Sequence, residues 1–182
     1  MRSLPLSIAA ACLYAVIAVS DARGVVYVTK KDFVKNNMPA GLKMTKVTVS
    51  LTEEQIDELK EEQDWKGQSS EYVFIVGKDK DGNKQAGVCF LTVHATEHRC
   101  VHHLAIALNG DGTVKEVSVR ELFCERAMAV ASKSFLGQFG KKAKHPIALN
   151  EDISAVTGAS ESSREVVNAV NAVVTVYSSF VK

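Results

Sequence analysis

The sequence predicts a single α+β domain: an antiparallel β-meander with helices on its N-terminal side and a long helix at its C-terminus. Three observations lead to this fold class. Short apolar runs separated by Asp-Gly and Asn-Gly turns fill the middle of the chain. Capped polar segments precede them, and an apolar run of helical period follows them to the end. The 182 residues are enough for one domain with a substantial core.

The first residues have the features of an export signal. Arg2 precedes an uncharged, mostly apolar run from Leu4 to Val19, and Ser20-Asp21-Ala22 has small residues at the two positions that a signal peptidase reads. We expect cleavage after Ala22, which leaves residues 23–182 as the mature domain. An uncleaved anchor is the alternative, although the run is slightly short for a spanning helix. The expected location is the periplasm or the outer face of the cytoplasmic membrane.

The net charge and the cysteine content exclude few classes of function. The formal net charge is +1, so the overall balance gives no indication of a nucleic-acid partner. The mature chain keeps Cys89, Cys100 and Cys124. An odd number in an exported protein requires a free thiol, an intermolecular bridge or a weakly oxidising compartment. These cysteines are too few for a disulfide framework.

Two helices are expected before the meander. Thr29 is a typical N-cap for the segment KKDFVKNN, which MPAG ends. Thr52 and Gln55 form a capping box that opens the helix EEQIDELKEEQDW. Its apolar stripe is narrow, so we expect most of this second helix to be solvated.

The meander is expected to contain about four strands. Each is a short run of β-forming residues bounded by turn residues. The runs are EYVFIVGK, QAGVCFLTVH, VHHLAIAL and VKEVSV. After them the pattern is mixed, with a short helix expected near Glu125 to Phe139.

The C-terminal helix is the clearest element. Ser162 with Glu165 reads as a capping box at its start. Apolar residues then recur at helical spacing up to the C-terminus: Val166, Val170, Val173, Tyr177 and Val181.

The segment that leads into this helix is unusually rich in small and hydroxylated residues. A glycine-containing turn before a helix offers backbone N–H groups and the positive end of the helix dipole, which suits a phosphate. Gly158 and Ala159 keep the approach open. Hydroxyl groups are available from Thr157, Ser160, Ser162 and Ser163. The simpler alternative is a helix cap without a ligand.

The order of these residues resembles a known flavin site. DISAVTGASESSREVVNAV is similar to the flavin-attachment segment of the FMN-binding domain family, in which an acidic residue and a spacer precede Ser/Thr-Gly-Ala-Thr. Upstream, SFLGQFGKK resembles the family's aromatic-x-x-Gln-Phe-x-x-Lys segment, and ALNGDGTVKEVSVRE resembles its strand, turn and Arg-Glu block. The family includes the C subunit of sodium-translocating NADH:quinone reductases and the G subunit of Rnf electron-transport complexes. The resemblance covers most of the mature chain.

The resemblance implies an FMN-binding-domain-like fold with the FMN phosphate at residues 157–160, next to the hydroxyls of Ser162 and Ser163. Ser160 occupies the position of the family's acceptor threonine, so the resemblance implies a phosphoester there; reversible FMN binding is the alternative. Arg120 and Glu121 match the Arg-Glu block and are expected as further cofactor contacts.

The implied function is electron transfer near the membrane between redox partner proteins, with membrane-bound partners as one alternative and soluble ones as the other. A covalent flavin would be added by a separate flavin transferase with FAD as donor. No catalytic motif brings Ser, His and Asp together in this sequence, so it favours an electron carrier or a component of a redox complex over a stand-alone enzyme.

Two other readings remain open. HATEHRCVHH contains four potential metal ligands that would share one face of a fully extended strand: His94, His98, Cys100 and His102. The second reading is an interaction domain that has the fold without the cofactor.

Overall fold

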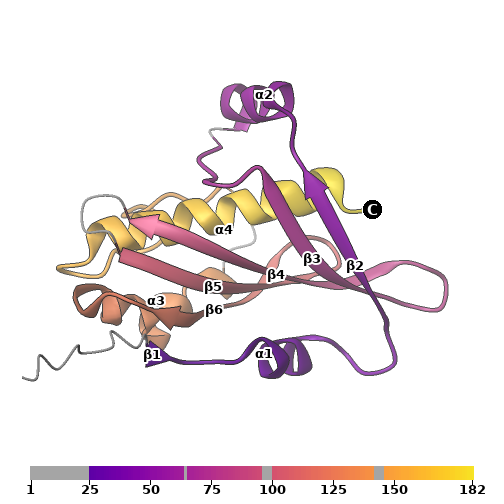
Figure 1. The fold of residues 1–182 in the computed structure, drawn as a ribbon, viewed down its shortest axis with the longest axis horizontal. Helices are drawn as coiled ribbons and strands as arrows, with labels where there is room; N and C mark the ends of the chain where they lie inside the picture. The colour runs from indigo at the N-terminus through magenta and orange to yellow at the C-terminus, as the bar shows by residue number, and fades with distance from the viewer. Residues whose placement is uncertain (1–24, 64, 96–99, 142–145) are drawn as a thin grey trace, which may run out of the picture.

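The computed structural model describes residues 25–63, 65–95, 100–141 and 146–182, and the expected export signal lies outside the described residues. One six-stranded antiparallel sheet forms the centre of the molecule, with strand order β1-β6-β5-β4-β3-β2 (Figure 1). The strands are β1 (Val25–Val26), β2 (Lys43–Ser50), β3 (Glu71–Lys78), β4 (Lys84–Ala95), β5 (Cys100–Asn109) and β6 (Val114–Leu122).

The predicted fold class is confirmed, and the four expected strands of the meander are β3 to β6. The two outer strands were not expected. β2 is polar at most positions and has only Val49 buried, so its sequence lacks a strong strand signal. It forms because its backbone pairs with β3 over all eight residues.

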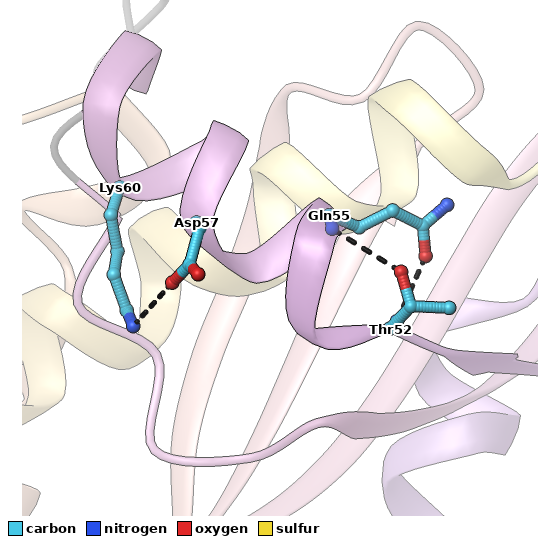
Figure 2. Close-up of polar contacts among 4 residues, drawn as sticks. All are labelled: Thr52, Gln55, Asp57 and Lys60. Carbon is cyan, nitrogen blue, oxygen red and sulfur yellow. Dashed lines mark hydrogen bonds and ion pairs between the residues drawn. The ribbon is translucent and has the colours of Figure 1, made fainter.

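Both expected N-terminal helices are present. α1 (Lys30–Asn37) begins after Thr29, whose hydroxyl accepts a hydrogen bond from the backbone N–H of Asp32 at 3.1 Å. α2 (Glu53–Gln63) is opened by the reciprocal capping box: the N–H of Thr52 donates to Gln55 Oε1 at 3.0 Å, and the N–H of Gln55 donates to Thr52 Oγ1 at 3.2 Å (Figure 2). Lys60 and Asp57 form an ion pair on its exposed side (Figure 2).

Helices lie on both faces of the sheet. α4 (Ser160–Phe180) lies along one face and α1 lies against the other (Figure 1). Alternate side chains of β5 therefore enter two separate clusters. Leu104, Ile106 and Leu108 join the main core with α4, while Ala105 and Ala107 pack with Phe33 of α1. No helix among the described residues is long and apolar enough to cross a membrane.

The expected capping box of the last helix is wrong. α4 begins at Ser160, with Ala159 as N-cap, so Ser162 lies inside the first turn and is buried. Glu165 instead accepts a hydrogen bond from Gln68 Nε2 at 2.7 Å, a partner 97 residues away. A tertiary contact has thus replaced the local one.

The helix expected near Glu125 to Phe139 is present in three short pieces: η1 (Glu125–Ala131), α3 (Lys133–Leu136) and η2 (Phe139–Lys141). The break falls at Ser132, which has an extended backbone and caps α3 through its hydroxyl. A disulfide joins Cys124, just before η1, to Cys100 at the start of β5. Among the described residues Cys89 is a free thiol, which is one of the three explanations for an odd number of cysteines in the mature chain, and it is buried.

Candidate functional site

The turn before α4 forms an open backbone cradle. Gly158 has φ +78°, and no heavy atom lies within 4 Å of the place where a Cβ would stand. Ala159, the N-cap, makes no side-chain hydrogen bond to the helix. The first N–H groups of a helix have no acceptor within it, so an anion can complete their hydrogen bonding here. This end of α4 therefore has the geometry of an anion site.

The residues of this segment differ in exposure. Thr157, Gly158 and Ser160 are exposed. Ser162 and Ser163 are buried, with exposed fractions of 5% and 0%. The hydroxyl of Ser160 is therefore the one at the helix start that an approaching reagent can reach.

Ser163 braces the turn from inside. Its Oγ accepts the backbone N–H of Val156 at 3.0 Å and donates to the carbonyl of Ala159 at 2.9 Å. The N–H of Ala159 donates to the carbonyl of Val156 at 3.0 Å. The sequence predicts Ser163 as a ligand residue, whereas its hydroxyl already holds the shape of the cradle.

A small hollow adjoins the exposed side of the turn. It has a volume of about 40 Å³ and is lined by residues 158–162 together with Cys100 and Ala127. A cavity of roughly 10 to 15 Å³ holds one water molecule, so the hollow admits only a small end group and no aromatic ring. Glu161 is one of its lining residues. Sequence reasoning missed Cys100 and Ala127 because the disulfide and η1 bring them here from other parts of the chain.

Gln138 connects the segment SFLGQFGKK to the approach of the turn. Its Oε1 accepts the backbone N–H of Ser154 at 2.9 Å, and its Nε2 donates to the Ser154 carbonyl at 3.4 Å. The flanking Phe135 and Phe139 are buried and pack edge to face with ring centroids 5.6 Å apart. The aromatic residues anchor this segment in the core, and the amide fixes the chain that leads into the cradle.

Arg120 and Glu121 do not line the hollow. The guanidinium of Arg120 lies 5.7 Å from the ring centroid of Phe90, a residue that packs with the α1 cluster on the sheet face opposite α4. Glu121 pairs with His103 and Val26 in the ladder. Their role in holding a cofactor stays a prediction.

Three of the four residues of the alternative metal site are described by the structure, and these three do not come together. The sulfur of Cys100 is bonded to Cys124, and His102 is buried in the core while His94 is exposed. A shared face would require one continuous extended strand, whereas β4 and β5 form a hairpin. His98 lies outside the described residues. Elsewhere in the described chain, no group of three His, Cys, Asp or Glu residues is placed to hold a metal ion.

His102 is buried in an unusual environment. Its exposed fraction is 0%, and neither ring nitrogen has a hydrogen-bond partner among the described residues. Burial, and secondarily the charge of His94, lowers the pKa of His102 to about 4. The imidazole is therefore neutral in the folded protein at pH 7.

This pKa predicts a pH-dependent stability. The unfolded chain binds a proton at His102 near the ordinary pKa of 6.5, whereas the folded chain does so only near 4. The unfolded state thus holds more protons between these values, and the free energy of unfolding falls as the pH drops through this window. His102→Leu should remove this contribution. The urea concentration at the midpoint of denaturation should then depend less steeply on pH between 6.5 and 4. His103→Gln, on the same strand, is the control that should keep the slope. An unchanged slope in His102→Leu would contradict the assignment.

The fold is that of an α+β domain, and its last helix starts without a side-chain cap beside an open glycine turn. The family model of the FMN-binding domain matches residues 102–175, so this part of the chain is similar to that family. The match runs from β5 into α4 and includes the whole cradle. Comparison with curated proteins and with solved structures gave no match.

The family indicates FMN as the cofactor, and the cradle fits the phosphate end of that molecule. Three features lie within residues 158–160. Gly158 has a positive φ and free space at its Cβ position, the helix starts without a side-chain cap, and Ser160 has an exposed hydroxyl. Backbone N–H groups and a hydroxyl are the donors that phosphate oxygens accept.

Proposed function

We propose that this protein is an exported electron-transfer flavoprotein whose FMN is esterified to Ser160. The flavin supplies the redox chemistry when bound, and the protein holds and orients it. The observation that carries the proposal is the exposed hydroxyl of Ser160 at the first residue of α4, beside the open backbone of Gly158.

The residues of the site have two roles, to bind the phosphate and to hold the segment in place. The N–H groups at the start of α4 and the backbone at Gly158 receive the phosphate, and Ser163 and Gln138 keep the segment in shape. For covalent loading, a flavin transferase brings FAD; the Ser160 oxygen attacks the FMN phosphorus, the P–O–P bond breaks, AMP leaves and the hydroxyl proton is released. An oxygen nucleophile is required, and serine provides it.

The export signal over residues 1–22 supports a location outside the cytoplasm. A covalent cofactor suits that location because a dissociated FMN could not be replaced there. We further propose that redox partner proteins near the membrane donate and accept the electrons.

The test is Ser160→Ala, produced with export in a host that contains a flavin transferase. The wild-type protein should be yellow, and after denaturation it should keep the added mass of one FMN on the peptide that contains Ser160. Ser160→Ala should lose that mass without loss of its circular dichroism spectrum. Thr157→Val, which removes another exposed hydroxyl of the same turn, should keep it.

Three results would count against the proposal. Covalent mass that persists in Ser160→Ala would contradict the attachment residue. Wild-type colour that is lost on denaturation would show reversible FMN in place of an ester. A colourless exported protein would overturn the flavoprotein function.

A further inference from the structure

A groove lies on the sheet face opposite α4, away from the flavin cradle. α1 covers only part of this face, where Phe33 packs against Val88, Ala105 and Ala107. Beside α1 the sheet stays open, and the groove there has a volume of about 700 Å³. Its floor is apolar and half-buried, formed by Val34, Val73, Ile75 and Phe90.

Cationic side chains surround this apolar floor. Lys30 and Lys31 come from α1 and Lys46 from β2, and all three are exposed. None of them has a carboxylate partner among the described residues. Phe90 also lies between two cations, with Lys30 Nζ 5.4 Å and Arg120 Cζ 5.7 Å from its ring centroid. The groove therefore combines unpaired positive charge with an uncovered apolar surface.

Two acidic residues in or beside α1 have partners within the structure. Asp32 accepts a hydrogen bond from the hydroxyl of Thr29, and Glu116 accepts one from Asn37 Nδ2 at 2.9 Å. The densest acidic segment is α2, which has six carboxylates: Glu53, Glu54, Asp57, Glu58, Glu61 and Glu62. Figure 1 shows α2 on the far side of the sheet from α1. Although the net charge is near zero, the residues that line the groove include three lysines and no carboxylate.

We propose that this groove binds a small anionic amphiphile, namely a carboxylate with an acyl chain of medium length. Its volume lies in the range of small-molecule sites, roughly 300 to 1,000 Å³. The acyl chain would cover Val73, Ile75 and Phe90 and remove apolar surface from water. The carboxylate would reach the lysines at the rim, where it meets charge that has no internal partner.

Titration calorimetry with decanoate, below its micelle concentration, tests the proposal on the full mature chain. Wild-type protein should bind one decanoate. The uncharged methyl decanoate should bind at least about tenfold more weakly, since it loses the charge contacts with the rim.

Two matched double variants separate the groove from general positive charge. Lys30→Gln/Lys46→Gln removes one rim lysine from α1 and one from β2. Because two exposed charge contacts with the carboxylate are lost, decanoate binding should weaken by about tenfold. Lys35→Gln/Lys43→Gln removes one lysine from each of the same elements outside the groove lining and should stay within about twofold of wild type.

A substitution in the floor tests the apolar part. Ile75→Glu should abolish binding in a protein whose circular dichroism spectrum stays that of wild type. Each of three results would overturn the proposal. Wild-type protein does not bind decanoate, it binds decanoate and methyl decanoate with equal affinity, or the two double variants lose affinity equally. Flavin content does not enter these measurements, so the groove and the flavoprotein function can fail separately.

Discussion

Gly158→Val should abolish flavin loading while the domain remains folded. The residue has φ +78°, a region that a β-branched side chain adopts at a cost of about 1 to 3 kcal/mol. The turn therefore relaxes toward negative φ, which moves the backbone away from the position that receives the phosphate. The added side chain also fills the open space beside Ser160. We expect at least about a tenfold lower rate of flavin loading, and with it a lower flavin-to-protein ratio, since about 1.4 kcal/mol added to the barrier of the transfer has that effect.

Gly82→Val provides the matched control. Gly82 has φ +86° and equally free space, but it lies in the turn between β3 and β4. Both variants should lose similar stability in urea denaturation, and only Gly158→Val should lose flavin by absorbance and intact mass. Equal flavin content in the two variants would mean that the backbone at Gly158 does not hold the cofactor.

Removal of the disulfide should give the largest change in stability. Cys100 and Cys124 are separated by 24 residues, and a closed loop of this length stabilises the folded state by about 3 kcal/mol through the entropy of the unfolded chain. Cys100→Ala/Cys124→Ala should lower the free energy of unfolding by roughly this amount. Flavin loading should fall as well, because Cys100 and Ala127 line the hollow beside the cradle.

Urea denaturation with and without reductant measures this effect. Reductant should destabilise the wild type and leave Cys100→Ala/Cys124→Ala unchanged. Cys89→Ala should keep the sensitivity to reductant, since Cys89 forms no bridge and burial raises the pKa of its thiol to about 12. A wild type that is insensitive to reductant would contradict the assignment of the bridge.

The elements that the sequence predicted well are those defined by contacts within a few residues. The capping box of Thr52 and Gln55 needs only neighbours three apart, and it is present with both hydrogen bonds. The four meander strands follow from a two-residue period interrupted by glycine turns, one of which contains Gly82. The TGAS turn could likewise be identified because its glycine and hydroxyls are consecutive.

Prediction failed where a distant part of the chain competes for the same group. Ser162 and Glu165 have the spacing of a capping box, yet Glu165 binds Gln68 and the helix starts at Ser160. β2 becomes a strand through pairing with β3, although its own residues are mostly polar. The metal hypothesis assumed one extended segment, whereas the hairpin sends His94 and His102 to different environments.

The sequence by itself thus determined the two N-terminal helices, the four strands of the meander and the glycine and hydroxyls of the turn, because these depend on side chains that are adjacent or at a fixed helical or strand period. Only the tertiary structure decided what surrounds the cradle. Ser163 and Gln138 brace it through hydrogen bonds to backbone groups seven and sixteen residues away, and the disulfide brings Cys100 beside it. Such contacts depend on how the sheet and α4 pack together, which no local pattern of residues encodes.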